Sequence, residues 1–144
     1  NMTGWRLGFA VGNAEILSGL AKIKTNVDSG PFMATQEAGI FALDNDETLT
    51  PPLRKIYQER RDIFVQALQN AGFKIEAPQA TFYIWMEIPS GQTSAQFCNR
   101  LLENGVVATP GTAFGNEGEG FVRFTLTAPK EILQQAAELI GKSV

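Results

Sequence analysis

A single stretch in the middle of the chain, residues 81–87 (TFYIWME), places the strongest restriction on the fold. Phe82, Ile84 and Met86 alternate with Tyr83 and Trp85, so a strand formed here has apolar side chains on both faces. A strand of this kind is typical of a sheet that is covered on both sides. We therefore expect residues 81–87 to form a central strand.

The elements around this strand predict an α+β fold. A helix is expected to begin at Thr50-Pro51-Pro52 and to end at Gly72, where the hydrophobic period changes from helical spacing to alternation. Further strands are expected at 73–76, 106–109 and 121–126, with helices at 94–104 and after Pro129. The order α-β-β-α-β-β-α indicates a mainly antiparallel sheet with helices packed on one face.

The N-terminal segment has a different pattern. Trp5, Leu7, Phe9 and Val11 alternate from the very start of the chain, which predicts a strand over residues 1–12. We expect this strand to continue a structure that begins upstream of it. Two helices should follow, one capped by Asn13 and reaching about Lys24, and one starting at Pro31 after a loop at 25–30. The acidic break at 44–47 predicts a boundary between a domain at 1–48 and a domain at 49–144.

Composition excludes several classes of function. The net charge is −3 and Lys and Arg form no run, so neither nucleic acid nor a membrane is an expected partner. The single cysteine, Cys98, predicts no disulfide framework and favours a reducing, cytoplasmic setting. The chain has no histidine, which excludes histidine-based nucleophilic systems and the usual zinc sites within it. Its chemistry must use Arg, Lys, carboxylates and backbone groups.

Two arginines and one loop are the candidates for such chemistry. Arg6 and Arg123 each lie in an otherwise apolar stretch, and the glycine-containing loop at 109–115 precedes the strand of Arg123. Either arginine could simply occupy the solvated face of its strand. A guanidinium held by a strand is also well suited to bind a carboxylate through two hydrogen bonds, and glycines allow a ligand to come close to the backbone.

Three motifs, taken in order, resemble those of a known family. They are residues 1–8 (NMTGWRLG), 109–115 (TPGTAFG) and 119–123 (EGFVR), with TFYIW at 81–85 between them. Together they resemble the C-terminal part of the fold-type I aminotransferases, which use pyridoxal phosphate. Residues 24–30 (KTNVDSG) and 36–38 (QEA) are most similar to the LL-diaminopimelate aminotransferase branch.

The resemblance implies a role for three residues. Arg6 matches the arginine that binds the cofactor phosphate, and Arg123 matches the arginine that binds the substrate α-carboxylate. Asn26, expected in the loop after the first helix, matches a residue that reaches the active site of the partner subunit in a homodimer. Residues 1–48 would then be a strand-helix-helix part of the large cofactor domain, and 49–144 the small C-terminal domain. The substrates implied are an amino acid and a 2-oxo acid.

The resemblance also places the Schiff-base lysine of the family immediately upstream of Asn1. Lys22 and Lys24 are expected on a surface helix and do not replace it. We therefore expect the chain as written to be inactive, with residues 1–48 misplaced, disordered or packed against another copy and 53–144 folded as a unit. Two alternatives stay open: a non-catalytic regulatory or ligand-binding domain of the aminotransferase fold, and a pyridoxal-phosphate lyase of the same fold.

Overall fold

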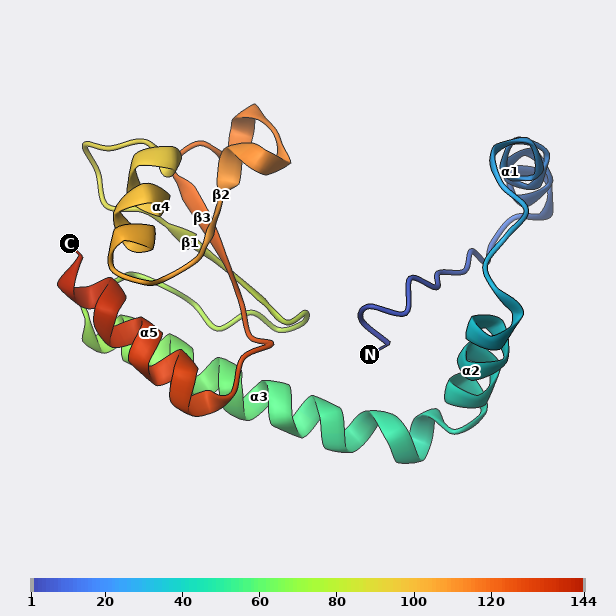
Figure 1. Cartoon of the computed structure of the whole chain (residues 1–144), viewed down its shortest axis with the longest axis horizontal. Helices are drawn as coiled ribbons and strands as arrows, with labels where there is room; N and C mark the ends of the chain where they lie inside the picture. The colour runs from blue at the N-terminus through green and yellow to red at the C-terminus, as the bar shows by residue number, and fades with distance from the viewer. Residues whose placement is uncertain (1, 144) are drawn as a thin grey trace. The chain divides into compact units, whose positions relative to one another are not determined.

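A computed structural model describes residues 2–143, and its contacts divide the chain into two units that meet at Leu53 and Arg54 (Figure 1). The division falls inside helix α3 (Asp46–Asn70). The domain boundary between residues 48 and 49 stays a prediction. Asn1, the first residue of the N-terminal motif, lies outside the described residues.

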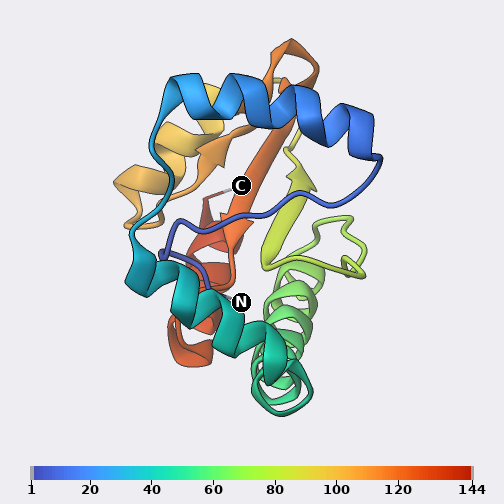
Figure 2. The same cartoon turned by 90° about the vertical axis from the view of Figure 1, so that its right-hand side faces the viewer.

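The second unit is built on an antiparallel sheet of three strands in the order β1-β3-β2. Figure 2 shows β1 (Tyr83–Glu87) and β3 (Phe121–Thr125) side by side, with Trp85 opposite Arg123 in the register. The third strand, β2 (Thr109–Pro110), pairs with the other edge of β3. Helices α4 (Ser94–Glu103) and α5 (Lys130–Lys142) complete the unit with α3. The expected fold class, a mainly antiparallel sheet with helices packed on it, is confirmed.

The core of this unit lies between the helices and one face of the sheet. Ile84 and Met86 of β1 and Val122 and Phe124 of β3 all point into it, because alternate residues of a strand share a face. The helices contribute the remaining large buried side chains, which include Phe64, Leu68, Phe97, Leu101, Leu133 and Ile140. The burial of each such side chain contributes about 1.5–3 kcal/mol to the free energy of unfolding.

Local sequence signals account for where two of these helices end. The N–H of Phe73 donates to Leu68 O and the N–H of Gly72 to Gln69 O, with Gly72 at φ +94°. This is the pattern in which a left-handed glycine closes a helix. The same pair of hydrogen bonds recurs at Gly105, after α4. The expected helix ends at both glycines are confirmed.

The start of α4 is also set by its sequence. Thr93 accepts a hydrogen bond from the N–H of Gln96, and the Gln96 side chain accepts one from the N–H of Thr93. Each group satisfies a donor that the helix itself leaves free. The sequence predicts Thr93 or Ser94 as the cap of this helix, and the structure confirms Thr93.

Several expectations about the strands are wrong. Strand β1 lies at an edge of the sheet rather than at its centre, and Trp85 is 43% exposed, so one face of this strand is open in the second unit. The central strand is β3. Residues 73–76 form no strand, and the expected strand at 106–109 is reduced to the two residues of β2. Alternation alone does not supply the hydrogen-bonded neighbour that a strand requires.

Three expectations about the helices also need correction. Helix α3 begins at Asp46, so Pro51 and Pro52 lie inside it rather than at its first turn. The first turn forms ahead of the prolines, because Asn45 O accepts from the N–H groups of Thr48 and Leu49. Helical spacing predicts that Leu102 of α4 and Ile132 of α5 face inward, but both side chains are more than half exposed.

The basic side chains of α3 mostly serve the fold. The Arg60 guanidinium donates through Nη1 to the carbonyls of Leu126 and Thr127, both at 3.1 Å, and so holds the end of β3 and the chain that follows it. Arg61 donates to Pro78 O and pairs with Asp62. The alternating charges of this helix predict a mostly solvated face with pairing between residues four apart, whereas these two arginines donate to main-chain carbonyls instead.

The first unit contains helices α1 (Ala14–Val27) and α2 (Met33–Asp44). Asn13 caps α1 as expected, accepting from the N–H groups of Glu15 and Ile16. Helix α1 extends beyond Lys24 into the predicted loop, and α2 begins two residues after Pro31. None of the residues of α1 is buried, and much of the apolar surface of both helices is exposed, including Ile16, Leu20, Ile23, Phe32, Met33, Ile40 and Phe41.

The expected N-terminal strand is absent from residues 2–12. Gly4, Arg6 and Gly12 have positive φ angles of 94°, 55° and 154°, and such angles interrupt an extended strand. Trp5, Leu7, Phe9 and Val11 alternate, but no neighbouring strand pairs with this segment. Its backbone N–H and C=O groups therefore lack the hydrogen bonds that a sheet provides.

Across residues 2–143, no helix has the length and the apolar character needed to cross a membrane.

Candidate functional site

Arg123 occupies the middle of the central strand β3. It is opposite Trp85 of β1 on one side and Thr109 of β2 on the other. Its neighbours Val122 and Phe124 point into the core, so the Arg123 side chain lies on the opposite face of the sheet, where it is half-buried. Because β3 is paired with a strand on each side, the backbone at this position is held more rigidly than in a loop.

Aromatic rings surround the Arg123 guanidinium. Its Cζ lies 4.1 Å from the centroid of the Tyr83 ring and 4.3 Å from that of Phe114. Trp85 meets Phe114 edge to face at 5.7 Å and stacks on Phe121 at 5.5 Å. We call these five residues, Tyr83, Trp85, Phe114, Phe121 and Arg123, the Arg123 face. Rings within about 6 Å of a guanidinium attract its charge and restrict its position.

The Arg123 guanidinium has no carboxylate partner within residues 2–143. The faces of the two rings attract the charge of the guanidinium without occupying its hydrogen-bond donors. Those donors are therefore available to a ligand. A planar donor fork that is fixed in place and unpaired can bind a carboxylate through two parallel hydrogen bonds. The chemistry of this arrangement suits a carboxylate ligand, and the role of Arg123 stays a prediction.

The loop that carries Phe114 is held by contact between two glycines. Its two short 3₁₀ helices, η1 (Gly111–Phe114) and η2 (Asn116–Gly118), place Gly111 directly against Gly118. A Cβ on Gly111 would overlap the carbonyl of Gly118 and would lie 2.9 Å from Phe121 O. Only residues without a side chain allow the two backbones to approach in this way.

Glu119 attaches the end of the same loop to α4. Its Oε1 accepts hydrogen bonds from the N–H of Ser94 at 2.7 Å and from the N–H of Gly120 at 3.1 Å. The hydroxyl of Ser94, which is fully buried, accepts from the N–H of Gly120 and donates to Gly118 O. The hydrogen bond from the Ser94 N–H, followed by that from Gly120, lowers the pKa of the Glu119 carboxyl.

Glu119→Gln should therefore change how stability depends on pH. Because the pKa of Glu119 is lower in the folded state, the ionised carboxylate stabilises the fold above its ordinary pKa of 4.5, and this stabilisation is lost as the pH falls through the lowered value. We expect the Tm of the variant to lie below that of the wild type at pH 7 and the difference to shrink below about pH 4. Thermal unfolding followed from pH 7 to pH 3 measures this.

Glu117→Gln is the matched control, because Glu117 lies two residues earlier in the same loop and accepts neither hydrogen bond. Its Tm should follow the wild type across the pH range. Equal pH profiles for Glu119→Gln and Glu117→Gln would contradict the role assigned to Glu119.

The other two predicted site residues lie in the first unit. Arg6 is exposed and has a left-handed backbone, rather than lying in a strand as expected. Asn26 lies within the last turn of α1 and not in a loop, because the helix runs on to Val27, and its Nδ2 donates to Lys22 O at 2.6 Å. Both residues belong to the first unit and Arg123 to the second, and the roles assigned to Arg6 and Asn26 stay predictions.

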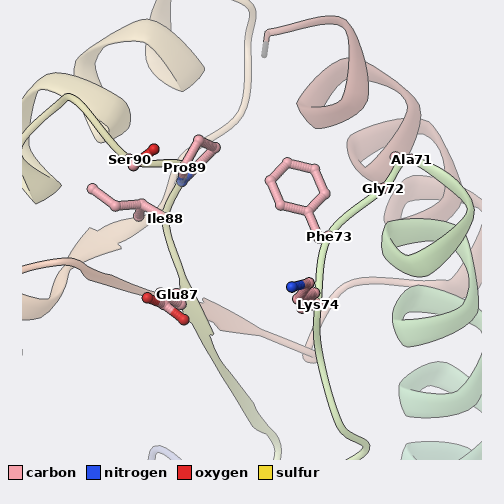
Figure 3. Close-up of a pocket in the computed structure, with 8 residues that line it drawn as sticks. All are labelled: Ala71, Gly72, Phe73, Lys74, Glu87, Ile88, Pro89 and Ser90. Atoms are coloured by element: carbon pink, nitrogen blue, oxygen red, sulfur yellow. The ribbon is translucent and has the colours of Figure 1, made fainter.

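Two pockets lie away from the Arg123 face. One, of about 390 Å³, is lined by residues that follow α3 and by residues at and after the end of β1, among them Phe73 and Ile88 (Figure 3). The other, of about 200 Å³, includes Cys98. Burial raises the pKa of the Cys98 thiol, which makes it a poor nucleophile. Neither pocket is lined by Arg6, Asn26 or Arg123.

The sequence prediction missed the neighbours that hold Arg123 in place. Phe114 was part of a loop singled out only for its glycines, and Tyr83 was assigned to a covered strand. A signal for Tyr83 was present, since it alternates in phase with Trp85 on the face opposite Ile84. No local signal indicates that Phe114 contacts a residue nine positions further along the chain.

Comparison with known proteins gives a consistent result. The family model described as "Aminotransferase class I and II" matches residues 1–140. The chain is 51% identical over 143 residues to an LL-diaminopimelate aminotransferase of Syntrophobacter fumaroxidans, covering 99% of this chain and 37% of the relative. It is 52% identical over 141 residues to an LL-diaminopimelate aminotransferase of Aquifex aeolicus, covering 97% of this chain and 36% of the relative. The chain thus spans little more than a third of the length of these relatives.

Solved structures agree in fold. A probable N-succinyldiaminopimelate aminotransferase from Thermus thermophilus matches with a TM-score of 0.89 at 34% identity, over 99% of this chain and 39% of that one. An aspartate aminotransferase from the same organism, solved with maleate, matches with a TM-score of 0.88 at 32% identity, over 99% and 38%.

Proposed function

Because the chain belongs to the class I and II aminotransferase family, we propose that the protein transfers an amino group between an amino acid and a 2-oxo acid, with pyridoxal phosphate as its cofactor. The single observation that carries this proposal is the Arg123 guanidinium, which lies on a central strand against two aromatic rings and has no carboxylate partner among residues 2–143. An α-carboxylate is common to the amino acid and the 2-oxo acid, so one guanidinium can bind both substrates in turn.

Arg123 would orient the substrate as well as bind it. Two parallel hydrogen bonds to the carboxylate leave few rotations open, and this sets which bond at the α-carbon faces the cofactor. The cofactor, when bound, supplies the electron sink and carries the amino group between the two halves of the reaction. The apolar rings beside Arg123 keep water from competing for its donors and strengthen the interaction.

Arg6 is the residue of this chain that would hold the cofactor phosphate. It fits that role in chemistry, since its guanidinium is exposed and has no carboxylate partner within residues 2–143. A guanidinium binds phosphate with the same planar donor fork that it offers to a carboxylate. The left-handed backbone at Arg6, with φ of 55°, is the kind of costly conformation that is found at ligand sites.

Asn26 would act in a homodimer, reaching the active site of the partner subunit. Its Nδ2 is already hydrogen-bonded to Lys22 O, so the amide oxygen is the atom that it can offer to a donor on a substrate. The homodimer and the cytoplasmic setting both remain predictions.

We propose LL-diaminopimelate as the amino donor, on the basis of relatives that share about half of their residues with this chain over nearly all of it. The solved neighbours support a donor or acceptor with a second polar end, since their names refer to N-succinyldiaminopimelate and to maleate bound to an aspartate aminotransferase. All of these compounds carry at least two carboxylates.

The test uses the native full-length protein with pyridoxal phosphate, LL-diaminopimelate and 2-oxoglutarate. We expect glutamate to form at the rate at which the donor is consumed, and no glutamate to form when either substrate is omitted. Aspartate and alanine serve as comparison donors. Loss of a substituent from the donor without glutamate formation would indicate the lyase, and cofactor binding with no reaction of any donor would indicate a non-catalytic domain.

A further inference from the structure

The rings that contact Arg123 come from two different segments of the chain. Tyr83 lies on β1, two residues before Trp85, the residue opposite Arg123. Phe114 lies at the end of η1, in the loop between β2 and β3. Tyr83 is half-buried, whereas Phe114 is 51% exposed. An exposed ring adds little to the core, so the position of Phe114 calls for another explanation.

The loop that carries Phe114 is fixed by backbone contacts and hydrogen bonds, although the Phe114 side chain is exposed. Gly111 and Gly118 lie in direct backbone contact, and Glu119 attaches the end of the loop to the first turn of α4. Phe114 is therefore fixed at both ends of its loop, and its ring also meets Trp85 at 5.7 Å. These contacts set the ring over the guanidinium before any ligand arrives.

We propose that Phe114 is a positioning residue for carboxylate recognition: together with Tyr83 it holds the Arg123 guanidinium in one plane, so that its donors are arranged for the substrate before binding. The inference rests on the proposed function of Arg123. A free arginine side chain has several rotatable bonds and loses their entropy when it binds. The attraction between the rings and the cation reduces that loss in advance, because the guanidinium is already confined.

The test compares Phe114→Leu with Phe114→Tyr in the native full-length protein. Leucine keeps apolar bulk but removes the ring, and we expect kcat/KM for LL-diaminopimelate to fall about tenfold, mainly through a higher KM. Tyrosine keeps the ring and should retain kcat/KM within about twofold of the wild type. Equal losses in both variants would contradict the proposal, since loop packing and not the ring would then be responsible.

Tyr57→Leu provides a matched control. It removes a ring that lies 5.6 Å from the Cζ of a different arginine, Arg60, in the same unit. We expect this variant to lower Tm while leaving KM for LL-diaminopimelate unchanged. A rise in KM equal to that of Phe114→Leu would show that any lost ring weakens the site through stability, and would overturn the proposal.

A second measurement does not depend on activity. With ¹⁵N-labelled arginine, the Hε signal of Arg123 is assigned by its loss in Arg123→Lys, and in the wild type it should carry the upfield shift expected above a ring face. We expect Phe114→Leu to remove much of that shift and Tyr57→Leu to leave it in place. An unchanged signal in Phe114→Leu would refute the positioning role, whereas a wild-type protein that transfers no amino group would refute only the proposed function.

Discussion

Arg123→Lys should lower kcat/KM for the amino-acid substrate by about 100-fold in the native full-length protein, which corresponds to ~2.7 kcal/mol of transition-state stabilisation. Lysine keeps the positive charge but loses the planar pair of donors that binds both carboxylate oxygens. One charge-assisted hydrogen bond contributes about 1.5–3 kcal/mol, and the poorer orientation of the α-carbon adds to that loss. Lysine also contacts the rings of Tyr83 and Phe114 less completely than the flat guanidinium does.

Steady-state kinetics with varied donor and varied 2-oxo acid measure this effect. Both substrates should be affected, because both carry the α-carboxylate that we propose Arg123 binds. Arg100→Lys is the control: Arg100 lies on α4 in the same unit and uses its Nη1 to donate to Ser143 O. It should cost some stability and leave kcat/KM near the wild-type value. Near-normal kinetics for Arg123→Lys would refute the assigned role.

Gly111→Ala is the second change for which we expect a large effect, a loss of about 3 kcal/mol in the free energy of unfolding. The added methyl group overlaps two backbone groups, the carbonyl of Gly118 and the carbonyl oxygen of Phe121. A backbone group cannot change rotamer to make room, as a flexible side chain can. The loop must therefore shift, and Phe114 moves with it. We expect a rise in KM for the carboxylate substrate in addition to the loss of stability, which denaturant unfolding and steady-state kinetics together measure.

Gly19→Ala controls for the loss of glycine itself. Gly19 lies inside α1, and a Cβ placed there meets no atom within 4 Å. Alanine at a helix interior is favoured over glycine by about 1 kcal/mol, so this variant should be slightly more stable than the wild type. A Gly111→Ala protein as stable as Gly19→Ala would show that the contact between Gly111 and Gly118 is not close enough to matter.

Helix boundaries that depend on a few neighbouring residues were predictable from the sequence. Asn13 and Thr93 cap their helices, and Gly72 and Gly105 end theirs. Each of these signals acts through hydrogen bonds between residues at most five positions apart, so the sequence contains both partners. The start of α3 was missed because proline normally marks the first position of a helix, whereas Pro51 and Pro52 lie inside this one.

The strands depend on partners distant in sequence, and there the predictions failed more often. Residues 73–76 and 106–108 have suitable patterns but form no strand, and the stretch at 81–87 was placed at the centre of the sheet although it lies at the edge. Alternation indicates which side chains share a face. It does not indicate how many neighbours a strand has.

The sequence by itself determined the fold class, the family resemblance and the choice of Arg123 as a carboxylate-binding residue, because these depend on residue type, order and spacing. Only the tertiary structure decided what surrounds that arginine. Tyr83 and Phe114 lie 40 and 9 positions away from it in the chain, and they reach it through the antiparallel register of β1 with β3 and through the contact of Gly111 with Gly118. A side chain's chemistry belongs to its residue, whereas the position and confinement of that side chain come from elements that meet only when the chain has folded.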